Sequence, residues 1–293
     1  MGNTNGKMDL KQIQFKNLNQ EQLALLVSWA AAEGWNPGLK DAEAFWAADP
    51  NGYVGCFLNN ELIGGISIVA YNRSYGFMGL FILQPHYRAH GLGDQLVKLT
   101  KNRLHERLKP GAAIGGDGVV AMQPYYKSLG FETAFRDERF ERRGETFELN
   151  PNVRPFSETD FVPVCHYDQR CFGAGRVSFL RSWLTLPTHQ CFVYAQDNEI
   201  SGYAVLRKAK TGYKIGPLFA NDAAVAEALY QACLNAAQDE LTYLDIPVIN
   251  KEAVALVKKY EAKYVFECAR MYDGNPPPVN IDQVFGITSF ELG

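Results

Sequence analysis

The stretch of sequence that decides the fold reads FILQPHYRAHGLGDQL and runs from Phe81 to Leu96. Its apolar start predicts a buried strand, and its amphipathic end predicts a helix that begins near Gly91. Between the two lies a short basic loop that contains Arg88. The first turn of a helix carries unpaired N–H groups and a partial positive charge, and Gly91 and Gly93 let the backbone approach an anion closely. The segment is therefore suited to hold a diphosphate, to which Arg88 would add a fixed charge.

Two other kinds of phosphate-binding loop do not fit this stretch. A Walker-type loop needs Gly-Lys-Ser or Gly-Lys-Thr, and neither sequence follows here. A dinucleotide-binding fingerprint needs a preceding strand that starts a βαβ unit. The strand before Arg88 instead follows two predicted strands at 53–58 and 62–71, with short turns between them, so it belongs to an antiparallel meander.

The remainder of the first 150 residues completes a mixed α/β domain. Alternating apolar residues predict strands, and apolar residues spaced three and four apart predict helices. Asn19 and Gln22 have the spacing of a capping box at the start of the first helix. In order, the expected elements are a strand at 11–15, helices beginning after 19 and at 41, strands at 53–58, 62–71 and 75–83, a helix from 91, a strand at 112–120, a helix at 123–129 and a strand from 131.

Two motifs in this order resemble those of the GNAT acetyltransferase superfamily. Arg88, Gly91 and Gly93 match the signature (Arg/Gln)-x-x-Gly-x-(Gly/Ala), while Ala89 stands where a glycine is frequent but optional. Residues 126–131 read YKSLGF and match the second signature of the family, Tyr-x-x-x-Gly-Phe. The resemblance implies an N-acetyltransferase that uses acetyl-coenzyme A (acetyl-CoA) as cosubstrate and needs no metal.

The second half of the chain repeats the same order of elements in a weaker form. We expect an α/β protein with a mixed sheet and tandem GNAT folds: a catalytic domain at 8–148 and a degenerate GNAT-like domain at 152–293. The counterpart of the phosphate loop, at 216–223, lacks the Arg-x-x-Gly-x-Gly pattern, and Asp222 would place a negative charge near the phosphates. We therefore expect the second half not to bind coenzyme A, and to complete the acceptor pocket or support the first half.

The resemblance also implies how residues would act in acetyl transfer to an amine. A free alkyl amine has a pKa of about 10, so it must lose a proton before it attacks. Backbone amides of the strand before the loop would face the acetyl group and the pantetheine arm, and Tyr126 would protonate the leaving thiolate. The residues expected to bind the cofactor are Phe81, Ile82, Leu83, Arg88, Ala89, His90, Gly91, Leu92, Gly93, Asp94 and Tyr126.

The base that receives the amine proton is not fixed by the sequence. Glu33 ends the first helix beside a loop expected to border the acceptor, and Asp117 lies in the strand expected beside the cofactor strand. Either carboxylate could anchor or deprotonate a cationic amine, and a solvated or capping role is the alternative for both. The residues expected to bind the substrate are Trp35, Asn36, Tyr71, Phe77 and Asp117.

Composition limits the other functions to consider. The 293 residues carry 29 basic and 32 acidic side chains, and this balance gives none of the basic footprint of a nucleic-acid-binding protein. The six cysteines are dispersed without a CxxC pair, which favours neither a zinc site nor a disulfide framework. No stretch approaches a membrane span and the first residues form no secretory signal, so we expect a soluble, cytoplasmic protein with a flexible tail at 1–7.

The expected function is acetylation of a small-molecule amine acceptor, such as an amino acid, an amino sugar or a polyamine. A second enzymatic interpretation is a protein-lysine or N-terminal acetyltransferase, which would need an open groove for a peptide strand. A third interpretation is a coenzyme A-binding sensor without catalysis, and the intact phosphate loop and Tyr126 argue against it. The sequence leaves both a monomer and a homodimer open.

Overall fold

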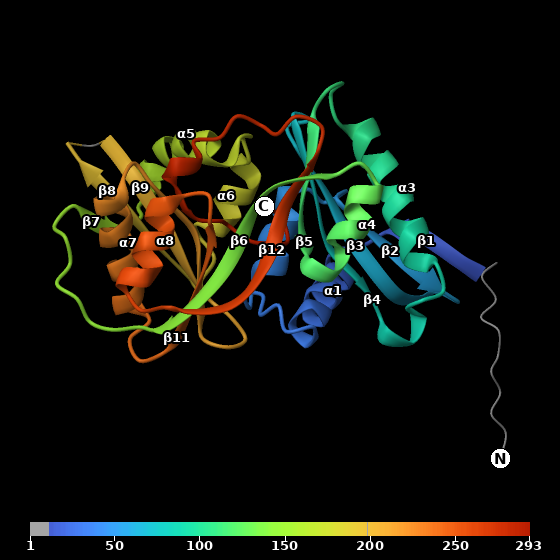
Figure 1. Cartoon of the computed structure of the whole chain (residues 1–293), viewed down its shortest axis with the longest axis horizontal. Coiled ribbons are helices and arrows are strands. Elements are labelled where there is room, and N and C mark those ends of the chain that lie inside the picture. The colour runs from blue at the N-terminus through green and yellow to red at the C-terminus, as the bar shows by residue number, and fades with distance from the viewer. Residues whose placement is uncertain (1–11, 198) are drawn as a thin grey trace, which may run out of the picture.

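The computed structural model describes residues 12–197 and 199–293, in which helices pack on both faces of one long mixed sheet (Figure 1). The flexible tail expected at 1–7 lies outside the described residues. The elements of the first half are β1 (Ile13–Asn17), α1 (Gln20–Ala32), α2 (Asp41–Ala48), β2 (Tyr53–Leu58), β3 (Glu61–Tyr71), β4 (Tyr75–Leu83), α3 (Leu92–Arg107), β5 (Ala113–Val119), α4 (Gln123–Ser128) and β6 (Glu132–Arg143).

Local sequence signals account for most of these elements. The predicted capping box is present, because the Asn19 side chain accepts from the Gln22 amide at 2.8 Å and the Gln22 side chain accepts from the Asn19 amide at 2.9 Å. Asn59 and Asn60 take φ angles of +51° and +69°, which are the angles of a two-residue hairpin turn. The predicted strands at 53–58 and 75–83 are confirmed, and the first strand begins at Ile13, two residues later than predicted.

The second half repeats this order of elements. They are β7 (Val153–Pro155), α5 (Phe161–Phe172), α6 (Val177–Trp183), β8 (His189–Gln196), β9 (Glu199–Lys208), β10 (Tyr213–Ala220), α7 (Ala223–Ala236), β11 (Leu241–Pro247), α8 (Lys251–Lys259), β12 (Lys263–Asp273) and β13 (Val284–Gly286). Two helices, α5 and α6, lie between β7 and β8, as α1 and α2 lie between β1 and β2. None of the helices in the described ranges is both long and apolar enough to cross a membrane.

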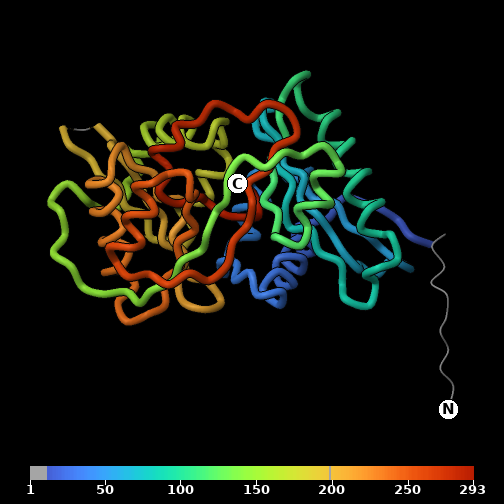
Figure 2. The backbone as a smooth tube through the Cα atoms, viewed as in Figure 1, coloured from blue at the N-terminus to red at the C-terminus, as the bar shows by residue number. Residues whose placement is uncertain are grey.

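The two halves exchange their last long strands. The sheet order is β1-β2-β3-β4-β5-β12-β6-β11-β10-β9-β8-β7, and β13 pairs with β10. Strand β12 of the second half pairs with β5, and β6 of the first half pairs with β11, while β6 and β12 pair with each other. Figure 2 shows these two strands, green and red, running side by side across the middle of the molecule. Each half therefore completes the sheet of the other.

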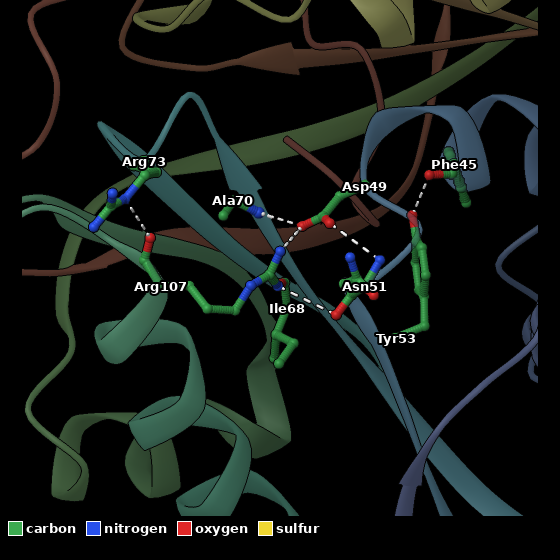
Figure 3. A network of polar contacts seen from close by, with 8 residues as sticks. All are labelled: Phe45, Asp49, Asn51, Tyr53, Ile68, Ala70, Arg73 and Arg107. Atoms are coloured by element: carbon green, nitrogen blue, oxygen red, sulfur yellow. Dashed lines mark hydrogen bonds and ion pairs between the residues drawn. The ribbon is translucent and has the colours of Figure 1, made fainter.

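A polar network fixes α3 at the end far from its glycines (Figure 3). Arg107, in the last turn of α3, donates to the carbonyl of Ile68 in β3 at 2.8 Å and pairs with Asp49, which follows α2. Asp49 also accepts from the Ala70 amide at 2.9 Å. Leu96 and Leu104 on the buried face of α3 pack into the core over the same sheet. α3 is thus held along its buried face and at its C-terminal end, and its first turn lies beside the end of β4.

Candidate active site

A cavity of about 570 Å³ lies where β4 and β5 diverge. The two strands pair in parallel only from Tyr75↔Ala113 to Met78↔Gly116. Beyond this point β4 shifts register against β3, and Leu80 takes a φ of +47°, as in a β-bulge. The β5-facing edge of β4 has no strand partner here within the described ranges. Three residues expected on this edge, Phe81, Ile82 and Leu83, line the cavity.

The cavity passes through the sheet from one face to the other. At one end its lining includes Val97 of α3 and Phe131, which belong to the apolar cluster under α3 and α4. At the other end it includes Trp35 and Phe290, which pack against the cluster on the opposite face. A thioester arm could enter from the first end, and a second reactant could meet it from the other. This arrangement suits a transfer between two molecules that need not share one entrance.

The predicted phosphate loop lies at the α3 end of the cavity. Ala89 and Gly91 take left-handed φ angles of +64° and +75°, and α3 begins directly afterwards at Leu92. Gly91 has no side chain to cap the helix, which leaves N–H groups of the first turn for an anion. A Cβ at Gly93 would lie 2.9 Å from Cζ of Phe81, so a glycine lets the helix approach β4. The backbone therefore has the shape that a diphosphate requires.

The side chain of Arg88 fastens this loop to its neighbours. Its Nε donates to the Leu83 carbonyl at 2.8 Å, and its guanidinium pairs with Glu33 at the end of α1. Both charged groups are partly exposed, so their pairing contributes little to stability. Glu33 lines the cavity as the partner of Arg88. Its role as a base, and the contact of Arg88 with phosphate, stay predictions.

Tyr126 lines the cavity close to β5. It lies on α4, and a Cβ at Gly118 would be 3.0 Å from its ring, so this glycine allows the ring to pack on the strand. Burial, with a smaller effect of Cys268, raises the pKa of Tyr126 to about 12. The phenol is therefore protonated at neutral pH, which is the state needed to donate a proton to a thiolate. Its neighbour Tyr125 donates instead to Asp94 at 3.1 Å.

Asp117 is held by an arginine from the second half. Its two carboxylate oxygens accept from Nε and Nη2 of Arg270, on β12, at 2.6 and 2.9 Å. Burial alone would lower the pKa of Arg270, but Asp117, Tyr272 and Asp137 together outweigh this effect and raise the pKa above its ordinary value. Asp117 lines the cavity with both oxygens engaged in this pair. Its predicted roles as base and substrate ligand stay predictions.

Two sequence models identify the family of the chain. The model described as "Acetyltransferase (GNAT) family" matches residues 17–131, and the model described as "Acetyltransferase (GNAT) domain" matches residues 164–286. The chain belongs to the GNAT acetyltransferase family. It is a two-domain member, because one match falls in each half, and the tandem GNAT folds expected from the sequence are confirmed.

Known proteins resemble this GNAT chain along most of its length. Holothin acyltransferase of Pseudoalteromonas sp. (strain SANK 73390) is 26% identical over 280 residues, which are 95% of this chain and 94% of that protein. A crystal structure of an acetyltransferase candidate from Pyrococcus horikoshii has a TM-score of 0.82 at 20% identity and covers 98% of both chains. A tandem GNAT protein from the clavulanic acid biosynthesis pathway has a TM-score of 0.62 at 12% identity, over 90% of this chain and 99% of the other. The relatives and the family support an acyltransferase.

In the second GNAT fold, an additional strand occupies the position at which the first fold has its cavity. Strand β13 pairs with β10 at Leu218↔Gly286 and Phe219↔Val284, and so fills the edge that corresponds to the free edge of β4. Only two residues separate β10 from α7, and the carboxylate of one of them, Asp222, accepts from the Val225 amide at 2.9 Å. An acidic cap thus occupies the helix start. These features support the prediction that this half does not bind coenzyme A.

Of the residues expected to bind substrate, Trp35 and Asp117 line the cavity of this GNAT protein. Asn36 does not line it, because its side-chain amide exchanges two hydrogen bonds of 2.9 Å with the backbone of Thr211. Tyr71 and Phe77 are buried below the lining. The Tyr71 hydroxyl donates to the Leu292 carbonyl at 2.9 Å, and this contact positions residues that do line the cavity.

Five lining residues from the second half were not predicted. Phe266, Cys268 and Met271 lie on β12, and Phe290 and Glu291 lie in the last segment of the chain. The alternation of Phe266 and Cys268 indicates one face of a strand, but nothing local in the sequence shows that β12 pairs with β5. No pattern in the sequence singles out Phe290 and Glu291.

Proposed function

We propose that this protein transfers the acetyl group of acetyl-CoA to the primary amine of a small molecule. The observation that carries the proposal is the cavity through the sheet, which joins the phosphate loop and Tyr126 to a separate end lined by Trp35 and Phe290. When bound, acetyl-CoA supplies the activated acyl group. The first turn of α3 would hold its diphosphate, and the free edge of β4 would receive its pantetheine arm and orient the thioester.

A small acceptor is supported by how the second half covers the sheet. Residues 288–293 and β12 cross the acceptor end of the cavity, and both are held by buried contacts to the first half. They leave a pocket of limited volume. A peptide substrate would need an extended groove beside the sheet.

The test is release of free thiol from acetyl-CoA across a panel of primary amines. The expected result is amine-dependent release, with an acetylated amine identified by mass spectrometry. Coenzyme A binding without release on any amine would contradict the proposal and favour a sensor. Acetylation of lysine-containing peptides at a higher kcat/KM than any small amine would favour a protein acetyltransferase.

A further inference from the structure

Four carboxylates of the described residues line the cavity, and three of them are already paired with a basic side chain. The three pairs are Glu33 with Arg88, Asp94 with Lys98 and Asp117 with Arg270. The fourth carboxylate belongs to Glu291, a residue that is only 1% exposed. Its Oε2 has no hydrogen-bond partner within the described ranges, and none of the ion pairs formed there includes it. A buried carboxylate without a partner is costly, so it indicates a ligand that supplies one.

The segment that carries Glu291 is held firmly against the first half. The Glu291 carbonyl accepts from the Ser67 hydroxyl at 3.3 Å, and the next carbonyl, of Leu292, accepts from Tyr71. A Cβ at Gly79 would lie 2.1 Å from the Glu291 carbonyl oxygen, so the segment rests directly on β4. Gly79 immediately precedes the bulge at Leu80, where the cavity opens. Glu291 is therefore fixed beside the point at which a thioester would face the acceptor.

The walls around this end of the cavity are aromatic. Trp35, Phe266 and Phe290 all line it. The guanidinium of Arg139 packs on two of these rings, 4.7 Å from the centre of Phe266 and 5.3 Å from the centre of Phe290, and donates to the Trp35 carbonyl at 3.0 Å. Rings held in this way suit an apolar, flat molecule.

Three charged groups act on Glu291 from the strands around it: Asp117 of β5, Arg139 of β6 and Lys214 of β10. Arg139 is bound to Asp245 at 2.6 Å, and Asp117 is bound to Arg270. Burial, helped by Arg139, lowers the pKa of Lys214 to about 8, although Glu291 opposes the shift. Lys214 therefore loses its charge, and with it its attraction for the Glu291 carboxylate, as the pH rises through about 8.

We propose that Glu291 binds the ammonium group of an apolar, aromatic amine and takes its proton, as a catalytic residue on the acceptor side. This inference rests on the proposed function. One ammonium proton passes to the Glu291 carboxylate, and the neutral nitrogen attacks the thioester carbon. The C–N bond forms, the C–S bond breaks, and the sulfur takes the Tyr126 proton. The second nitrogen proton restores Tyr126 through water, and Glu291 releases its proton to solvent, so each turnover releases one proton.

The first experiment compares an acceptor that must lose a proton with one that need not. The substitution Glu291→Gln is expected to lower kcat/KM for 2-phenylethylamine about 100-fold. Phenylhydrazine is largely neutral at pH 8 and needs no base to remove an ammonium proton before it attacks. For this acceptor the loss in kcat/KM is therefore expected to stay below about tenfold. Equal losses on both acceptors would overturn the assignment, since a purely structural role would affect them alike. The matched control is Glu261→Gln, an exposed glutamate of the same half.

A second variant separates catalysis from charge balance. If Glu291 only offsets the charge of Lys214, then Lys214→Met added to Glu291→Gln would restore the rate with 2-phenylethylamine. We expect no restoration, and recovery to within about threefold of the wild type would overturn the proposal. Coenzyme A affinity and the thermal midpoint of Glu291→Gln are expected to stay close to those of the wild type.

A binding measurement needs no turnover. Calorimetric titration of 2-phenylethylamine into the protein without acetyl-CoA is expected to show about tenfold weaker binding to Glu291→Gln, because one charge-assisted hydrogen bond is lost.

In the wild type, 2-phenylethylamine is expected to exceed spermidine and glucosamine in kcat/KM by at least about tenfold, because its ring buries apolar surface. A preference for either polar amine would overturn the assignment of an aromatic acceptor. If the wild type acetylates amines and Glu291→Gln does so at the same rate, only the proposed role of Glu291 would be overturned. A wild type that neither binds nor acetylates any amine would overturn both proposals.

Discussion

Gly91 shows how one backbone angle prepares the anion site. Its φ of +75° lies in the left-handed region, and a Cβ there would meet no other atom within 4 Å. The substitution Gly91→Glu is expected to weaken coenzyme A binding at least about 100-fold, because its charge would repel the diphosphate bound at the helix start. Gly111, at the other end of α3, has a φ of +82° and equally open space. Gly111→Glu carries the same backbone strain and charge, and should retain its affinity for coenzyme A in a calorimetric titration. Equal affinities of the two variants for coenzyme A would contradict the placement of the diphosphate at the start of α3.

Tyr126 gives a prediction about turnover rather than binding. Tyr126→Phe removes only the hydroxyl and is expected to lower kcat about 100-fold with coenzyme A affinity unchanged. Because burial raises the pKa of Tyr126 to about 12, the hydroxyl keeps its proton through neutral and moderately alkaline pH. The kcat of the wild type should therefore not fall through loss of this proton between pH 7 and 10. Tyr264→Phe, an exposed tyrosine on β12, is the control. An unchanged kcat in Tyr126→Phe would remove this residue from the mechanism.

At the scale of elements, the cofactor end of the site could be predicted and most of the acceptor end could not. The strand, loop and helix at residues 81–96 are specified by neighbouring residues, whose apolar pattern and glycines suffice to indicate them. Tyr71 was expected in the pocket because it is aromatic, yet its hydroxyl binds the carbonyl of Leu292, 221 residues away. Asn36 likewise binds Thr211. Such partners are set by the packing of distant segments, and a local pattern carries no signal of them.

The contact between β4 and the end of the chain gives a prediction at the same scale. Gly79→Ala would place a Cβ 2.1 Å from the Glu291 carbonyl, so residues 288–293 must move away from the strand. We expect a loss of about 1–3 kcal/mol in unfolding free energy and a raised KM for the amine, with the KM for acetyl-CoA changed less. Gly111→Ala strains a left-handed backbone (φ +82°) in open space, so as the control it should destabilise the chain without raising the KM for the amine. Equal KM values for the amine in wild type and Gly79→Ala would show that this segment does not shape the acceptor end.

At the scale of the molecule, the repeat of the fold could be predicted, whereas the exchange of strands could not. A strand pattern shows which residues face the core, and it does not say which of two similar sheets the strand will join. In the structure β12 lies between β5 and β6, so Arg270 of the second half meets Asp117 of the first. The domain limits at 148 and 152 stay a prediction. The second half is thus part of the cavity wall, in addition to being a second copy of the fold.

The exchange also predicts how the protein unfolds. Removing β12 from the sheet would leave β5 without its neighbour and would separate Asp117 from Arg270, so neither half can lose its structure while the other keeps its own. We expect calorimetry of the full chain to show one transition, with calorimetric and van't Hoff enthalpies that agree. Leu23→Ala in the first half and Leu229→Ala in the second remove fully buried side chains and should each cost about 2–5 kcal/mol. Both variants should lower the midpoint of the same single transition. Two transitions, each shifted by only one of the variants, would show that the halves unfold independently despite the shared strands.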